Sequence, residues 1–316
     1  MPVSIPLDTL VYGMQLPIQS QSTIYAEPWE ASAGADELAF VAKAADRNGF
    51  WYVAVCDHVA IPRPLDEKMG TSWWDTIATL GWLAGITEHV HLMSHVYVLP
   101  YRHPLMAAKA FLTLDEVSGG RAVLGVGAGH VQAEFELLGV DFDRRGALLD
   151  DAIDVVRAAF TEEYPDVDTP SVRVAGAGLR PRGRQAGGPP IWVGGSSRAA
   201  LRRAADKGDG WLPQGPPPDG VKAAIAYLHE RREQNGRADL PFVVGGYGEV
   251  LYVGDPWFEP GPGQLAGPPE VIAERLRKSR AIGIDQVQLR FHTRSCAELC
   301  DQLDAFGSGV APLLAD

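Results

Sequence analysis

Two polar residues, Asp57 and His58, directly follow an apolar run that ends at Cys56. A histidine exchanges protons near neutral pH, so His58 is a candidate general acid or base. His130 follows a glycine-rich run further along the chain and is a second candidate. The sequence alone leaves structural roles equally open, with Asp57 capping a turn, His58 on the surface and His130 in a loop.

Small residues follow two further apolar runs. The first run, 122–126, leads into Gly127, Ala128 and Gly129. Backbone N–H groups can approach a ligand closely there because glycine has no Cβ. The second run, 191–193, leads into four small residues before an expected helix: Gly194, Gly195, Ser196 and Ser197. Helix N-termini bind anions, so this set suits a phosphate, although it would also serve as a turn and a helix cap.

Strand and helix patterns that could position these residues alternate along the whole chain. The expected strands cover residues 10–17, 50–56, 90–99, 121–126, 190–194, 210–213, 242–253 and 286–291. The expected helices cover residues 34–48, 76–86, 104–117, 144–160, 198–207, 220–234, 269–281 and 297–306. Two segments rich in proline and glycine, 162–188 and 254–268, interrupt the alternation and are predicted to be insertions, with a hairpin in the first.

This alternation has two solutions, a closed barrel or an open doubly wound sheet. An open dinucleotide-binding sheet predicts glycines after its first strand, where this chain has Gln15-Leu16-Pro17-Ile18. The glycine run at 125–130 departs from G-x-G-x-x-G at its last position. We therefore predict an α/β fold: one (β/α)8 TIM-barrel domain over residues 1–316, with insertions after the fourth helix and after the seventh strand. The carboxyl ends of its strands would bring the polar and glycine-rich segments together.

The composition narrows the function further. The chain has 316 residues, a net charge of −12 and no basic run, so we expect no nucleic-acid partner. No apolar run is long enough for a membrane span, and the N-terminus does not have the pattern of a signal peptide. Three cysteines without Cys-x-x-Cys spacing argue against a thiolate zinc site and for a reducing compartment, so we expect a cytoplasmic protein without a metal.

The segment 114–160, with its strand, glycine run and long helix, closely resembles the matching segment of the luciferase-like monooxygenase superfamily, in particular its deazaflavin (F420) dependent oxidoreductases. Asp57-His58 is the pair that F420-dependent members carry after the second strand. Gly194-Gly195 together with Asp209-Gly210-Trp211 resembles the phosphate-binding half of the superfamily, which does not distinguish F420 from FMN. The resemblance covers nearly the whole chain.

The resemblance implies a cofactor site made of Asp57, His58, Ser94, His95, Gly127, Ala128, Gly129, Gly194, Gly195, Ser196, Ser197 and Gln214. His58 would lie against the deazaflavin ring and act in proton transfer. A non-proline cis peptide bond is implied in the third strand, and counting back from Pro104 places it at Ser94–His95. Sugar-phosphate dehydrogenases of the F420 group have an acidic residue where this chain has His130, so a sugar phosphate is not implied as the substrate.

We expect an F420-dependent oxidoreductase that transfers a hydride between the cofactor and a small organic substrate, and that forms a homodimer. His58 and then His130 are the expected catalytic residues. The alternatives are an FMN-dependent monooxygenase of the same superfamily and a flavin- or F420-binding protein without turnover. Further candidates for ligand contact, each with packing or solvation as the default, are Trp73, Trp74, Tyr101, Arg180, Arg182, Arg184, Trp257, Arg290 and His292.

Overall fold

A closed barrel of parallel strands forms the centre of the protein in a computed structural model that describes residue 5 and residues 9–314. Its strands are β1 (Val11–Gln15), β2 (Tyr52–Val55), β3 (His91–Ser94) continued by β4 (Tyr97–Val98), β5 (Ala122–Gly127), β8 (Ile191–Gly194), β9 (Gly210–Leu212), β10 (Val243–Val253) and β12 (Gln286–Phe291). Pairing of β12 with β1 and of β9 with β10 closes the ring. The predicted (β/α)8 barrel is confirmed.

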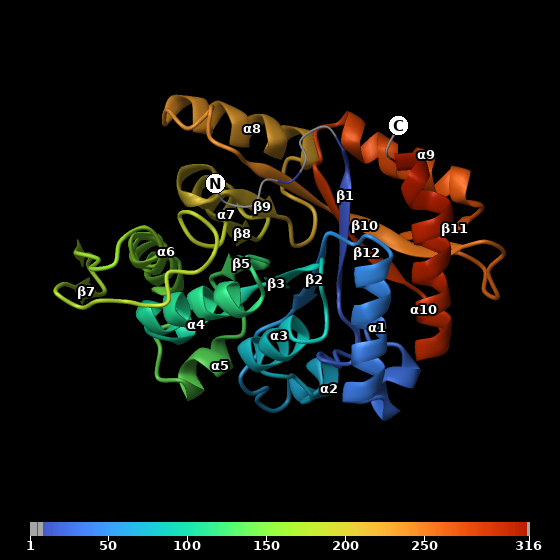
Figure 1. The fold of residues 1–316 in the computed structure, drawn as a ribbon, viewed down its shortest axis with the longest axis horizontal. Coiled ribbons are helices and arrows are strands. Elements are labelled where there is room, and N and C mark those ends of the chain that lie inside the picture. Colours follow the sequence, from blue (N-terminus) through green and yellow to red (C-terminus); the bar gives the residue numbers. More distant parts are fainter. Residues whose placement is uncertain (1–4, 6–8, 315–316) are drawn as a thin grey trace.

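Helices surround the barrel (Figure 1). The principal ones are α1 (Ala35–Arg47), α3 (Thr76–Ala84), α4 (Pro104–Val117), α6 (Arg145–Thr161), α7 (Arg198–Lys207), α8 (Val221–Gln234), α9 (Pro269–Ala281) and α10 (Cys296–Ala305). Each lies within a few residues of its expected range, because apolar residues recur at helical spacing and caps end the pattern. In the part of the chain that the structure describes, no helix is long and apolar enough to cross a membrane.

Successive side chains of each strand point to opposite faces, so the apolar residues form two clusters, one between the strands and the helices and one inside the barrel. In β2, Val53 and Val55 pack towards the helices, whereas Tyr52 and Ala54 belong to a separate cluster that fills the barrel interior with Trp192. Large aromatic rings fit there only because facing positions are small. A Cβ on Gly13 would lie 2.3 Å from the Tyr52 ring. The interior is therefore packed, and ligands have space only at the barrel ends.

The insertions and short helices complete the fold. Segment 162–188 contains the expected hairpin, β6 (Val167–Asp168) paired with β7 (Arg173–Val174). Segment 254–268 adds β11 (Gln264–Gly267) beside β10. Elements that the sequence patterns did not predict are 3-10 helices at Pro28–Ser32, Leu99–Tyr101 and Ala311–Leu314, a π-helix at Phe306–Val310, and the short helices α2 (Asp66–Met69) and α5 (Gln132–Leu137).

The arginines of the first insertion serve local structure. Arg180 pairs with Glu163 at 2.7 Å, and Arg184 pairs with Glu116 at 2.8 Å. Arg182 donates to the carbonyls of Ala159, Phe160 and Glu162 at the end of α6. Since these guanidinium groups already have partners, they give no support to a cofactor-tail site in the insertion.

Candidate functional site

His58 is held by a buried carboxylate that the sequence did not single out. Its Nδ1 lies 2.8 Å from Oε2 of Glu134, which is fully buried on α5. The same oxygen accepts a hydrogen bond from the Tyr101 hydroxyl at 2.8 Å. The other oxygen accepts from the backbone N–H groups of Val59 and Ala60 at 2.5 and 3.1 Å. Four donors therefore fix this carboxylate, and it fixes the imidazole.

The protonation state of Glu134 follows from these contacts. Burial alone raises the pKa of a carboxyl group, but the hydrogen bond and charge of His58, with the hydrogen bonds of Tyr101 and Val59, outweigh it and hold the pKa of Glu134 below its ordinary value. An ionised Glu134 accepts from Nδ1–H of His58 and so selects one tautomer. Among the described residues none forms a hydrogen bond with Nε2.

Asp57 is buried in an ion pair and is not exposed at the mouth of the barrel. Both of its oxygens bind the Arg102 guanidinium, at 2.6 and 3.0 Å, and Oδ2 also accepts from the N–H of Val98 at 2.7 Å. Thr76 donates to Oδ1 at 3.4 Å. Asp57 is buried, so this bidentate pair ties the end of β2 to the turn after β4. The carboxylate thereby positions His58, its neighbour in sequence.

His130 lies beside His58, as the barrel prediction requires. The two ring centroids are 5.8 Å apart, and the Trp73 ring lies edge-on to His58 at 4.3 Å. Burial and then the charge of His58 lower the pKa of His130, which Glu134 partly offsets. The structure thus brings both predicted catalytic histidines to one place, between the ends of β2 and β5.

The cis peptide bond lies one residue later than predicted, at His95–Val96. The expectation of Ser94–His95 was wrong because it counted back from Pro104 through an unbroken strand, whereas β3 ends at Ser94 and β4 begins at Tyr97. Ser94 is fully buried, and its hydroxyl donates to the Gly125 carbonyl at 2.8 Å. Its side chain therefore belongs to the barrel wall.

His95 has no partner for its ring. Both ring nitrogens are buried, and in the described part of the chain neither makes a hydrogen bond. A buried polar group without a partner is costly, so this ring is a candidate contact for a ligand or an ordered water. Burial, and then the charge of Arg290, lower the pKa of His95 to about 4.

We expect the His95 imidazole to stay neutral from pH 8 down to about pH 5. Its folded pKa lies below the unfolded value of about 6.5, so its share of the stability is present above that value and is lost as the pH falls towards 4. Two-bond ¹⁵N–¹H NMR of the imidazole rings measures this directly, with His95→Asn to assign the signal. A His95 midpoint near pH 6.5 would contradict the prediction.

The glycine-rich end of β5 allows close packing around the cis segment. A Cβ on Gly127 or Gly194 would lie 2.5 or 2.6 Å from the Val96 side chain. Gly129 has a φ of +79°, and a Cβ there would lie 2.7 Å from the Phe135 ring. These glycines, with the half-buried Ala128 between them, are thus required by the protein's own packing, whatever the backbone also offers a ligand.

The turn before α7, for which the sequence predicts an anion site, is shaped by Gly195 and two serines. Gly195 has a φ of +111°, which favours glycine. The Ser197 hydroxyl caps the helix by accepting from Ala200 N at 3.2 Å. The Ser196 hydroxyl donates to the Gly215 carbonyl and accepts from Gln214 N, which ties this turn to the end of β9. Both hydroxyls are therefore engaged, and the N–H of Gly195 donates to the Leu212 carbonyl at 2.9 Å, so the groups left for an anion are the backbone N–H groups from Ser196 into the first turn of α7.

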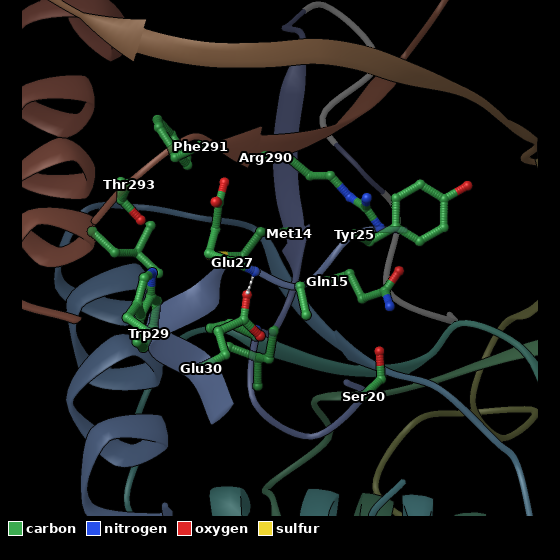
Figure 2. A pocket seen from close by; sticks show the side chains of 14 residues that line it. Met14, Gln15, Ser20, Tyr25, Glu27, Trp29, Glu30, Arg290, Phe291 and Thr293 are labelled. Carbon is green, nitrogen blue, oxygen red and sulfur yellow. Dashed lines mark hydrogen bonds between the residues drawn. The ribbon is translucent and has the colours of Figure 1, made fainter. Parts of the chain in front are cut away.

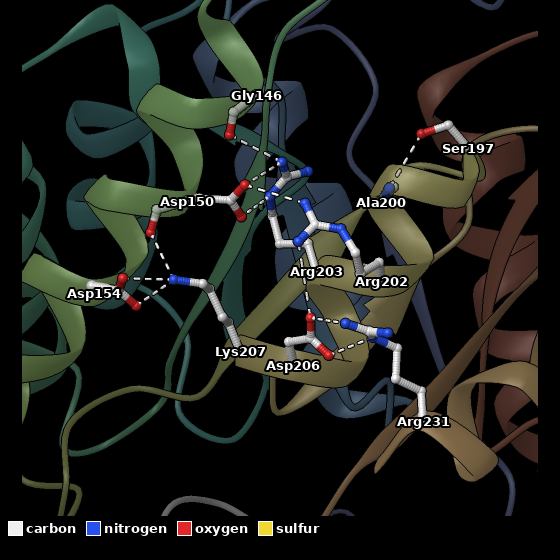
Figure 3. A network of polar contacts seen from close by, with 10 residues as sticks. All are labelled: Gly146, Asp150, Asp154, Ser197, Ala200, Arg202, Arg203, Asp206, Lys207 and Arg231. Atoms are coloured by element: carbon white, nitrogen blue, oxygen red, sulfur yellow. Dashed lines mark hydrogen bonds and ion pairs between the residues drawn. The ribbon is translucent and has the colours of Figure 1, made fainter. Parts of the chain in front are cut away.

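Ion pairs anchor α7 against its neighbours (Figure 3). The buried Arg203 binds Asp150 of α6 at 2.7 Å, and Lys207 binds Asp154 at 2.6 Å. On the other side, Asp206 pairs with Arg231 of α8 at 2.6 Å. This network holds the helix, and hence its N-terminal turn, in a fixed position at the barrel mouth.

A small cavity of about 60 Å³, open to solvent, lies beside the ends of β1 and β12 (Figure 2). Its walls include Gln15, Ser20, Tyr25, Arg290 and Phe291. His292, the other candidate from this strand, pairs with Glu27 at 2.5 Å and stacks on Trp257 with ring centroids 5.0 Å apart. Of the two candidates at the end of β12, Arg290 lines the cavity and His292 does not.

Sequence reasoning missed Glu134, the central residue of the histidine cluster. A signal was present: Glu134 lies four residues after His130 in a short amphipathic segment, but nothing in that segment indicates that it reaches the end of β2. Tyr101 was considered only as a pocket aromatic, and Arg102 was not considered as the partner of Asp57.

Comparisons with known proteins agree with this architecture. The Mycobacterium tuberculosis protein Rv0940c is 32% identical over 221 residues, covering 65% of this chain and 74% of that protein. The F420-dependent tetrahydromethanopterin reductase of Methanopyrus kandleri superimposes with a TM-score of 0.76 at 18% identity, over 97% of this chain and 99% of that one. Riboflavin lyase RcaE, solved with modified FMN and riboflavin, gives a TM-score of 0.80 at 14% identity, over 97% and 91% of the two chains.

These structures are similar in fold, and the family follows from the sequence. The sequence model described as luciferase-like monooxygenase matches residues 11–252, which include the ends of β1, β2, β5, β8 and β9. The chain belongs to the luciferase-like monooxygenase family.

Proposed function

We propose that this protein is an F420-dependent oxidoreductase that acts on a small organic substrate at the mouth of the barrel. The observation that carries the proposal is the fixed imidazole of His58, directly after β2 and beside His130. A general acid or base needs a defined tautomer and a free nitrogen near the reacting group. Glu134 provides the first, and the position of Nε2 provides the second.

The residues present fit a flavin-like group. His95 offers two ring nitrogens that need a polar partner, which the heteroatoms along the edge of such a ring system can supply. The amides before α7 suit a phosphate. When bound, F420 accepts or donates a hydride at its C5 atom. The protein's part is to orient the cofactor, exclude water, and move a proton through His58.

An FMN-dependent monooxygenase is the second candidate, because a protein of similar fold was solved with modified FMN. The phosphate turn before α7 serves either cofactor equally. Asp57-His58 favours F420 through its resemblance to the F420-dependent members, whereas the arginines of the first insertion add nothing. A binding protein without turnover is the third candidate. The His58 imidazole, which Glu134 holds in one orientation suited to proton transfer, argues against it.

We expect F420 to bind at least tenfold more tightly than FMN, a difference of about 1.4 kcal/mol. Titration of the apo protein with F420, F420H₂, FMN and NADPH measures this. Gly195→Ala should weaken whichever cofactor binds, because alanine is strained at a φ of +111° and its Cβ would lie 3.0 Å from the Ala200 side chain, which shifts the turn before α7. Gly283→Ala is the matched control, since Gly283 also has a positive φ, +92°, but precedes β12 at the opposite end of the barrel. Equal affinities or an FMN preference would promote the monooxygenase candidate.

A further inference from the structure

Arg290, at the end of β12, forms no ion pair with a described carboxylate, although the charge of Glu30 acts on it from a distance. Its guanidinium lies 4.0 Å above the Tyr25 ring, and no described residue forms an ion pair or hydrogen bond with it (Figure 2). Arg102 and Arg203, also largely buried, both have bidentate carboxylate partners. In a chain of net charge −12, a cation left unpaired in a cavity needs an explanation.

Burial makes this charge costly. Burial lowers the pKa of Arg290, but a guanidinium does not lose its proton in a protein, so the cation stays and requires a counter-charge. Two acids line the same cavity and both are engaged. Glu30 accepts from the N–H groups of Ile18 and Glu27 at 2.7 and 2.8 Å. Glu27 pairs with His292.

Other donors in the same cavity also lack partners. Trp29 Nε1 and Thr293 Oγ1 are buried without a hydrogen bond in the described structure, and both residues line the cavity. Met14, Phe291 and Leu299 provide apolar wall. A cavity with a cation, unfilled N–H and O–H donors and an apolar wall suits an organic molecule that carries an oxyanion.

The position of Arg290 separates it from the proposed cofactor phosphate. The α7 turn follows β8, and both β9 and β10 lie between β8 and β12 around the barrel. Arg290 instead lies near the ends of β1 and β2, where its charge acts on Cys56, and near His95. Because the proposed cofactor phosphate lies on the other side of the barrel mouth, the side around Arg290 is the one available to the substrate.

We propose that the substrate is an organic oxyanion, a carboxylate or a close analogue, whose charged group binds Arg290 in this cavity. That the bound anion is the substrate depends on the proposed function, whereas the existence of the anion site does not. An anionic group on the cofactor tail has the same chemistry, so the test must separate the two sources.

Benzoate and its neutral isostere benzamide are suitable probes, because they differ in charge at constant shape. Isothermal titration of the protein, with and without bound cofactor, should give a benzoate Kd at least tenfold lower than that of benzamide, the scale of one charge-assisted hydrogen bond. Arg290→Gln should abolish the difference, and Arg290→Lys should retain part of it. Arg294→Gln is the matched control, since Arg294 is exposed, lies in the loop that follows β12 and already pairs with Glu298.

The outcomes are distinct. Loss of benzoate preference in Arg290→Gln, with cofactor Kd unchanged and melting temperature retained, supports the substrate site. A weakened F420 Kd with benzoate preference unchanged assigns Arg290 to the cofactor tail and overturns the proposal. Equal binding of benzoate and benzamide to the parent protein also overturns it. If neither F420 nor FMN binds, the proposed function fails, while the benzoate measurement on the apo protein still decides the anion site.

Discussion

Replacing His58 with alanine is expected to lower kcat by about 100-fold or more, the usual scale of general acid–base catalysis, with a much smaller change in cofactor Kd. The reason is geometric: Glu134 and Tyr101 form a buried support that positions one imidazole and leaves Nε2 for the reacting molecule. Measuring kcat, KM and cofactor Kd on the same variant separates proton transfer from binding.

Two further variants sharpen this test. His89→Ala removes an exposed imidazole that lies 3.9 Å from the exposed Glu88, and it should change none of the three constants. Glu134→Gln keeps the shape of the support but removes its charge, so it should lower kcat by a smaller factor than His58→Ala. If His58→Ala affects cofactor Kd alone, His58 is a binding residue, and His130→Ala becomes the test of proton transfer.

Local patterns were sufficient for the barrel. The helix at Pro104–Val117 and the strand at Gln286–Phe291 have the expected bounds, because apolar periodicity, a proline in the first turn and flanking loops all indicate the same element. The third strand differs because its interruption at His95 and Val96 depends on tertiary packing. The Val96 side chain occupies the space left by the missing Cβ atoms of Gly127 in β5 and Gly194 in β8, two strands that are distant in sequence.

The site was less predictable than the fold for the same reason. His58 and His130 could be placed at one end of the barrel because each follows a strand. Their shared carboxylate, Glu134, lies on a short helix whose orientation no periodicity specifies. The lack of a partner for Arg290 cannot be read from sequence at all, since it depends on where Glu27 and Glu30 direct their oxygens.

Asp57→Ala is expected to reduce the free energy of unfolding by about 3–5 kcal/mol, the usual cost of removing one partner of a buried ion pair. The alanine would leave the Arg102 guanidinium without its carboxylate and the Val98 N–H without an acceptor, both in a largely buried position. Urea unfolding measures the change, with the slope of the transition checked against the parent protein.

The exposed pair Arg47–Asp304 provides the matched control, because its side chains are 52% and 50% exposed although its geometry is also bidentate. Asp304→Ala should therefore cost at most about 1 kcal/mol. In the double variant Asp57→Ala, Arg102→Met, the unpaired charge is gone and part of the lost stability should return. Equal losses for Asp57→Ala and Asp304→Ala would show that burial does not strengthen the Asp57 pair. The carboxylate would then serve the position of His58 alone, and its removal should lower kcat without lowering stability.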